Sequence, residues 1–211
     1  MIAIIDSGIA NLRSVQKGLE RVGFKARIIE HPRLLAEAAG IVLPGVGAFA
    51  DGIGKLSRHG FIEPLRRAIE RGRPVLGICL GLHFLFSESE EFGLHKGLDL
   101  LPGRVRRFAA DMPDSANSGL PLKVPHMGWN RVRMIRPAPI LAGLPEEPFF
   151  YFVHSYYVEP ADPSVTAGIT EHGRWFTSVI WRDNLFATQF HPEKSQASGL
   201  KLLANFAALT R

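Results

Sequence analysis

A single cysteine, Cys79, lies in a pattern that is typical of a reactive nucleophile. The stretch from Pro74 to Leu82 reads PVLGICLGL, so a glycine lies two residues away on either side of the cysteine. An apolar run that predicts a buried strand ends here, and a run rich in Leu and Phe that predicts a helix follows. At such a junction the side chain projects from a sharp turn, and the helix N-terminus favours a thiolate. The pattern predicts a nucleophile, although a lone cysteine can also be a small core residue.

A second stretch, near the C-terminus, supplies an imidazole and a carboxylate. It reads Gln189-Phe190-His191-Pro192-Glu193. Residues two apart in an extended segment project to the same face, where the carboxylate can orient the imidazole. The fold rather than sequence proximity assembles such groups, so the order Cys, His, acid is acceptable. We predict a triad of Cys79, His191 and Glu193, with a solvated histidine at a strand end as the alternative.

A glycine-rich loop is expected beside this triad. The strand Ile41 to Leu43 is followed at once by PGVGAF, residues 44–49. Its two glycines free backbone N–H groups to face a ligand, although many strand-to-helix turns carry glycine for purely structural reasons. Because ligands of open α/β sheets bind outside the carboxyl ends of the strands, this loop and Cys79 are expected at the same edge.

Composition indicates one globular domain that spans residues 1–211. The chain is 46% hydrophobic and 21% charged, and it has one cysteine, so it forms no internal disulfide. A lone cysteine suits the reducing cytosol, and we expect a cytoplasmic protein. The first residues, Met1 to Ile5, lack a basic lead and run into Asp6, so they predict a strand rather than a signal peptide. No window reaches the apolar length of a membrane span.

The net charge of +5 does not indicate a nucleic-acid partner, because the basic residues are scattered among acidic neighbours. The densest basic group is Arg104, Arg106 and Arg107. It predicts a solvated strand face, with a phosphate-binding patch as the alternative.

The elements predict an α/β fold with a mostly parallel open sheet flanked by helices. A strand at 2–6, a turn at 7–11, a helix with Leu12, Val15, Leu19 and Val22, and a strand at 24–29 form a βαβ start. Continuous apolar strands indicate a sheet covered on both faces. The first turn lacks GxGxxG, so a dinucleotide site is not expected.

Further helices are predicted near 34–39, 51–58 and 61–71, and from the Cys79 turn through Phe86. Beyond about residue 97 short strands replace this pattern, at 149–153, 165–170, 175–181 and 185–190. They predict additional antiparallel strands in the C-terminal half. Residues 108–121 predict an exposed loop, and Ser195 or Ser198 is expected to cap a last helix.

Five stretches together resemble one family. They are the Cys79 turn, PGVGAF at 44–49, PHMGWN at 125–130, FVHSYY at 152–157 and HPEKSQ at 191–196. The chain resembles the triad-type, or class I, glutamine amidotransferases over nearly its whole length, and within them the glutaminase subunits of imidazole glycerol phosphate synthase. The Cys, His and Glu set marks the superfamily, whereas PGVGAF, PHMGWN and VHSYY point to the subunit. The resemblance implies the flavodoxin-like fold of that family.

The resemblance implies that L-glutamine is hydrolysed to glutamate and ammonia, with no metal and no cofactor. Cys79 would attack the side-chain amide carbon, and His191 would protonate the leaving ammonia to give a γ-glutamyl thioester. Water activated by His191 would then release glutamate, while Glu193 holds the imidazole. The backbone N–H groups of Leu80 and Val46 would stabilise the oxyanion.

Glutamine is expected against three elements by the same resemblance. They are Gly47, position 83, and the turn of His154, Ser155 and Tyr156. Relatives usually have Gln at position 83, whereas this chain has His83. An imidazole can still donate or accept a hydrogen bond, so a contact with glutamine is expected, with a half-buried helix residue as the alternative.

The resemblance also implies a partner. Ammonia would pass directly to a (β/α)8-barrel cyclase subunit in a heterodimer, where imidazole glycerol phosphate and AICAR are formed in histidine biosynthesis. Asn11, Trp129, Tyr151 and Lys194 match positions at or near that contact. For Trp129, plain core packing is the alternative.

Three other functions compete with this interpretation. The chain could be the amidotransferase subunit of another synthase, such as that of anthranilate, carbamoyl phosphate or pyridoxal phosphate synthesis. A cysteine peptidase could use the same turn around Cys79. A non-catalytic scaffold subunit could keep these residues without using them.

Overall fold

The computed structural model describes residues 1–6, 11–112 and 121–211. The predicted turn at 7–11 therefore lies outside the described residues except for Asn11, and so does most of the predicted loop at 108–121.

Five parallel strands form one half of a large sheet. Their order across the sheet is β2-β1-β3-β4-β14. Strand β4 is central and buried, and it pairs with β3 on one side and β14 on the other, so its end is enclosed by two neighbours. The bounds are β1 Ile2–Ile5, β2 Ala26–Ile29, β3 Gly40–Gly45, β4 Val75–Cys79 and β14 Leu185–Thr188.

The other half of the sheet continues mainly with antiparallel strands, which come from residue 86 onward. From β14 the order runs β13-β11-β7-β5-β6, and β12 pairs with both β13 and β9. The bounds are β5 Phe86–Ser89, β6 His95–Lys96, β7 Leu101–Arg107, β9 Arg133–Met134, β11 Tyr156–Pro160, β12 Thr166–Glu171 and β13 Trp175–Arg182. The predicted α/β class, with added antiparallel strands in the C-terminal half, is confirmed.

Two strands form a separate antiparallel ribbon. They are β8, His126–Arg131, and β10, Phe149–His154. Their register pairs His154 with His126 and Tyr151 with Trp129. Because side chains alternate along a strand, these two pairs lie on opposite faces of the ribbon.

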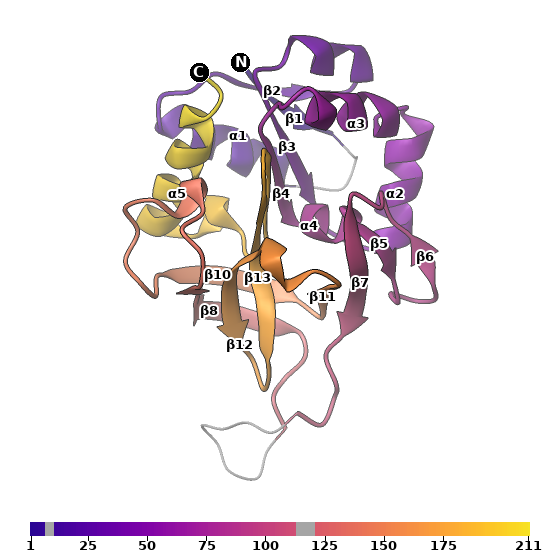
Figure 1. Ribbon diagram of the computed structural model, residues 1–211, viewed down its shortest axis with the longest axis vertical. Coiled ribbons are helices and arrows are strands. Elements are labelled where there is room, and N and C mark those ends of the chain that lie inside the picture. The colour runs from indigo at the N-terminus through magenta and orange to yellow at the C-terminus, as the bar shows by residue number, and fades with distance from the viewer. Residues whose placement is uncertain (7–10, 113–120) are drawn as a thin grey trace.

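Helices cover both faces of the parallel strands (Figure 1). In β1 the alternation divides the side chains, with Ile2 and Ile4 in one apolar core and Ala3 and Ile5 in the other. The first core also takes α1 and α5, and the second takes α2, α3 and α4. The helices are α1 Leu12–Arg21, α2 Phe49–Arg58, α3 Ile62–Glu70, α4 Leu80–Phe84 and α5 Gln196–Ala208.

Three local predictions differ in detail from the structure. The helix after Cys79 ends at Phe84 rather than Phe86, because the N–H of Leu98 bonds the Phe84 carbonyl and that of Asp99 bonds the Phe86 carbonyl. The helix expected at 34–39 is a 3-10 helix, η1, Pro32–Glu37. The hydroxyl of Ser195 does not cap α5, because it donates to the His191 carbonyl instead.

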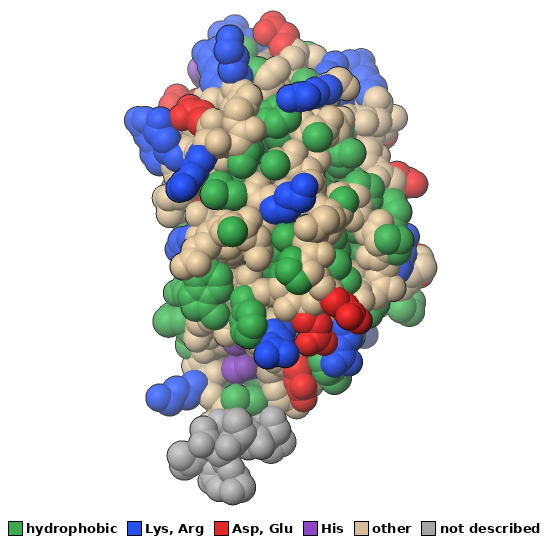
Figure 2. All heavy atoms as spheres, turned by 90° about the vertical axis from the view of Figure 1, so that its left-hand side faces the viewer, with side chains coloured by type: hydrophobic (Ala, Val, Ile, Leu, Met, Phe, Trp, Pro, Cys, Tyr) green, Lys and Arg blue, Asp and Glu red, His purple; other side chains and the backbone are tan. Residues whose placement is uncertain are grey.

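Figure 2 shows the side of the molecule on which α1 and α5 lie, and hydrophobic side chains are spread over the middle of this face, with charged side chains toward both ends. Within the described ranges, no helix is long and apolar enough to cross a membrane.

Candidate active site

Cys79 occupies a strained turn between β4 and α4. Its backbone has φ 55° and ψ −109°, a conformation that residues other than glycine seldom adopt. Gly81 makes the turn possible, because a Cβ at that position would overlap the carbonyl oxygen of Leu43 on β3. The sulfur therefore lies at the carboxyl end of the parallel strands, as the sequence pattern predicts.

His191 and Glu193 lie beside each other and are both deeply buried. His191 follows β14, and its Nδ1 lies 2.8 Å from Oε1 of Glu193. Burial lowers the pKa of His191, but the Cys79 sulfur and the Glu193 carboxylate outweigh it and raise this pKa to about 10. The Nε2 atom of His191 has no hydrogen-bond partner within the described residues. One ring nitrogen is thus held by the carboxylate, and the other is buried without a hydrogen-bond partner, so its hydrogen-bonding capacity is unused.

A cavity of about 210 Å³ opens in front of the cysteine and the histidine. It is formed by segments that are far apart in the sequence, and it includes every residue predicted to form the oxyanion hole or to bind substrate. Its lining is Val46, Gly47, Cys79, Leu80, His83, Glu91, Val153, His154, Ser155, Tyr156 and His191. Gly47 has φ 90°, so the loop takes a backbone conformation that favours glycine.

His83 faces the cavity and also has a protein partner. Its Nε2 lies 2.8 Å from the amide oxygen Oε1 of Gln189. Burial lowers the pKa of His83 to about 4, against the opposing effect of this hydrogen bond. The ring is therefore neutral, and its Nε2–H donates to an oxygen that can only accept. The Gln189 amide nitrogen then points to the Cys79 sulfur at 3.9 Å.

Glu91 places a carboxylate at the cavity that the sequence pattern did not predict. Its Oε2 accepts the backbone N–H of Phe49 at 2.6 Å. Burial raises the pKa of Glu91, and the bond from Phe49 opposes that shift. Glu91 provides an acceptor for a cationic part of a ligand, such as an ammonium group.

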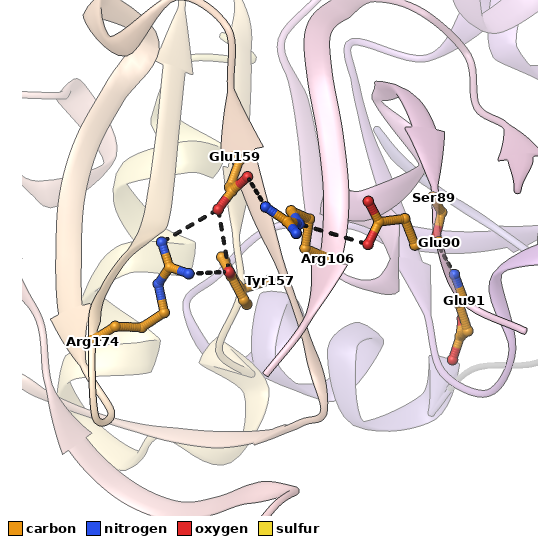
Figure 3. Close-up of polar contacts among 7 residues, drawn as sticks. All are labelled: Ser89, Glu90, Glu91, Arg106, Tyr157, Glu159 and Arg174. Carbon is orange, nitrogen blue, oxygen red and sulfur yellow. Dashed lines mark hydrogen bonds and ion pairs between the residues drawn. The ribbon is translucent and has the colours of Figure 1, made fainter. Parts of the chain in front are cut away.

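A ladder of charged side chains runs across the strands next to Glu91 (Figure 3). Arg174 contacts both Tyr157 and Glu159, at 2.5 Å and 3.3 Å. Arg106 lies 3.4 Å from Glu159 and 3.6 Å from Glu90, the residue before Glu91. Arg106 is thus engaged by two carboxylates, which supports the interpretation of the exposed basic group on β7 as a solvated strand face.

Three of the four predicted partner residues, Trp129, Tyr151 and Lys194, lie on or beside the β8–β10 ribbon. Trp129 is 46% exposed, and its ring lies 6.1 Å from that of Tyr151. The ammonium of Lys194 lies 5.8 Å from the Tyr151 ring centroid, within the range of a cation–π interaction. Asn11 is exposed at the start of α1. Trp129 therefore occupies a surface and not a core.

Three residues that contact this site were not predicted as site residues: Gln189, Glu91 and Val153, of which Val153 lines the cavity. Gln189 precedes His191 by two residues in an extended segment, so the alternation that places His191 in the site could have indicated Gln189 as well. Glu91 follows β5 in a turn, and no local pattern marks it, because the antiparallel half of the sheet brings it to the cavity.

Comparison with protein families gives a match over nearly the whole chain. The family described as glutamine amidotransferase class-I matches residues 3–209. Among curated proteins, the imidazole glycerol phosphate synthase subunit HisH of Syntrophotalea carbinolica is 58% identical over 206 residues, which cover 98% of each chain. The HisH subunit of Geobacter sulfurreducens is 52% identical over 208 residues, 99% of this chain and 98% of the relative.

Solved structures share the fold at low sequence identity. A crystal structure described as glutamine amidotransferase has a TM-score of 0.75 and 18% identity, covering 99% of this chain and 98% of the other. The structure of PurLQS from Thermotoga maritima has a TM-score of 0.76 and 16% identity, with coverage of 100% and 98%. At these identities the similarity supports the architecture alone.

Proposed function

The chain belongs to the class I glutamine amidotransferases and, within them, to the HisH subunits of imidazole glycerol phosphate synthase, and on this premise we propose how its residues act. The chain is the glutaminase subunit that hydrolyses L-glutamine to glutamate and ammonia for histidine biosynthesis. The observation that carries the assignment of roles is the cavity in which Cys79, the unpartnered Nε2 of His191 and the PGVG loop meet.

Cys79 is the nucleophile in the proposed reaction. Its sulfur attacks the side-chain amide carbon of glutamine, and the carbonyl oxygen takes up the negative charge. The backbone N–H groups of Leu80 and Val46, which both line the cavity, stabilise that oxyanion. His191 donates a proton to the amide nitrogen, so the carbon–nitrogen bond breaks and ammonia leaves a γ-glutamyl thioester.

His191 then serves as the base for the second half of the reaction. It takes a proton from water, which attacks the thioester carbon and releases glutamate and the thiolate. Glu193 holds the imidazole at 2.8 Å and stabilises its positive charge. The raised pKa of His191 favours the protonated ring that the first step requires.

Glutamine binds, we propose, with its amide toward Cys79 and its amino-acid end along the cavity wall. Gly47, His83 and the turn of His154, Ser155 and Tyr156 form that wall. Glu91 adds a carboxylate that can accept from the α-ammonium group.

The partner in this proposal is a (β/α)8-barrel cyclase subunit, in a cytoplasmic heterodimer. The apolar outer face of the β8–β10 ribbon supports a contact that uses Trp129, Tyr151 and Lys194. We include the exposed Asn11 at the start of α1 in the proposed contact on the family resemblance alone. We also propose that residues 1–211 form one domain, which the family match to residues 3–209 supports.

The test compares glutamine with ammonium salt as the nitrogen source for the reconstituted synthase. Glutamate release should depend on the cyclase subunit, and Cys79→Ser should abolish glutamine-dependent synthesis of imidazole glycerol phosphate. The same variant should retain synthesis from ammonium salt, which shows that the partner is intact. Full glutamine-dependent synthesis with Cys79→Ser would contradict the proposal and favour a scaffold subunit.

A further inference from the structure

Two buried histidines and an asparagine form a chain of hydrogen bonds behind the glutamine cavity. Asn130 and His126 come from β8, and His154 ends β10. The Asn130 amide nitrogen lies 3.1 Å from Nε2 of His126, and Nδ1 of His126 lies 2.9 Å from Nε2 of His154. Nδ1 of His154 lies 2.8 Å from the backbone carbonyl of Tyr156. The chain therefore ends at the turn that lines the cavity.

The direction of these bonds is fixed at the Asn130 end. The amide oxygen of Asn130 accepts the N–H of Arg131 at 2.8 Å, and its amide nitrogen donates to the Glu171 carbonyl at 2.8 Å. These contacts identify which atom is nitrogen, so Asn130 also donates to His126 and Nε2 of His126 accepts. The proton of the neutral His126 ring is then on Nδ1.

The Tyr156 end requires the same direction. A carbonyl oxygen only accepts, so Nδ1 of His154 must carry a proton, and Nε2 of the neutral ring must accept from His126. Burial, and then the neighbouring His172, lower the pKa of His126 to about 3, and burial, followed by His126, lowers that of His154, so both rings stay neutral. Both ends thus define one tautomer for each ring.

We propose that Asn130 and His126 are positioning residues for glutamine. They fix the tautomer of His154, so that its Nδ1–H donates to the Tyr156 carbonyl. This bond holds residues 154–156, which line the cavity, in one orientation. The inference rests on the proposed glutaminase function, since it concerns the same cavity. It assigns a role to two residues that do not line that cavity.

Packing alone is the competing explanation for these side chains. The His126 ring stacks on Phe152 at 4.8 Å and on His172 at 4.2 Å, so an aromatic ring at position 126 has a role without any hydrogen bond. The two explanations differ in which of two substitutions at this position should impair glutamine binding more.

The substitutions His126→Phe and His126→Asn separate the explanations in the complete synthase. Phenylalanine keeps the stacked ring and removes the donor to His154, whereas asparagine gives up the ring and can place an amide N–H close to the former Nδ1 position. Loss of a buried hydrogen bond should raise KM for glutamine roughly tenfold in His126→Phe, with a smaller change in kcat. His126→Asn should stay within roughly threefold of the wild-type KM.

The opposite order, with His126→Phe near wild type and His126→Asn impaired, would overturn the inference in favour of packing. Thermal unfolding of both variants reports whether they fold, and the synthesis rate with ammonium salt reports whether the complex assembles.

Histidine tautomers can be measured directly on the wild-type protein. Labelling histidine with ¹⁵N should show His126 and His154 neutral at pH 7 with the proton on Nδ1. Asn130→Asp should change the His126 signals, because a carboxylate oxygen, which accepts, then faces Nε2 in place of the amide N–H. Wild-type signals for a charged ring or for an Nε2–H tautomer would refute the chain. This measurement needs no glutamine, so it stands apart from the proposed function, which fails if the wild-type complex releases no glutamate.

Discussion

His191 combines deep burial with two neighbours that favour its protonated form, the Cys79 sulfur and the Glu193 carboxylate. A buried imidazolium is normally unfavourable, and here the Cys79 sulfur and the Glu193 carboxylate reverse that preference, so the pKa rises to about 10. Relative to an unfolded pKa of about 6.5, this stabilising contribution is complete below that pH and is lost as the pH rises through about 10. In the proposed reaction, the proton on this ring is the one that ammonia takes up as it leaves.

Titration of the His191 ring tests this arrangement. Its ¹⁵N signals should report an imidazolium at pH 7 to 8 and deprotonation near pH 10. Cys79→Ser should lower the His191 pKa more than Glu193→Gln does, because the sulfur has the larger effect of the two. A neutral His191 at pH 7 in the wild-type protein would contradict the prediction.

Among the elements, the junction of β4 and α4 depends on close contact between two backbones. The strained Cys79 turn brings α4 against β3 so closely that residue 81 has no room for a side chain. Neighbouring strands on both sides hold the end of β4, so the turn cannot relax without disturbing the sheet.

Gly81→Ala should therefore destabilise the fold by about 3 kcal/mol and reduce glutamine hydrolysis, because the new methyl group overlaps the Leu43 carbonyl. Gly54→Ala is the matched control: it lies within α2, where a Cβ meets only the flexible end of Arg58. Removing a helical glycine there should raise stability by about 0.5–1 kcal/mol. Urea unfolding monitored by circular dichroism measures both, and equal effects would refute the explanation.

The charged ladder of Figure 3 is extensive, yet we expect it to contribute little to stability. Arg106 is exposed and its ion pairs are longer than 3 Å, so solvent and salt screen them. Arg106→Ala should change Tm by less than about 3 °C at physiological salt. A drop of 10 °C or more in a differential scanning calorimetry experiment would show that the ladder is a structural requirement.

Sequence patterns predicted those parts of the site that depend on local chemistry. Cys79 with its glycines and the pair of His191 and Glu193 each lie in one short segment whose geometry follows from strand and turn preferences. The early end of α4 could not be predicted, because residues 98 and 99 terminate it through hydrogen bonds from a distant part of the sequence. Glu91 was missed for a similar reason, since strand pairing alone brings it to the cavity.

In the whole molecule, the β8–β10 ribbon separates the buried histidine chain from an apolar surface. His126, Asn130 and His154 lie on its inner face. Trp129 and Tyr151 lie on the other face, because the alternation of side chains places them opposite to the histidines. The N–H of His191 also bonds the Tyr151 carbonyl at 2.9 Å, so the ribbon is tied to the active site. Strand β10 alone would thus separate His191 from a partner bound on the outer face of the ribbon.

Trp129→Ala should raise the Kd for the cyclase subunit by about 20-fold or more, because large aromatic residues at the centre of an interface contribute most of the binding energy. Trp175→Ala is the matched control, since Trp175 is 44% exposed, against 46% for Trp129, and lies on β13 beside Arg133. Its affinity should stay within roughly threefold of wild type. Isothermal titration calorimetry with the purified cyclase subunit measures both, and circular dichroism shows whether each variant folds. If the two substitutions weaken binding equally, or if only Trp175→Ala does, the partner binds elsewhere and the outer face of the ribbon is not its contact.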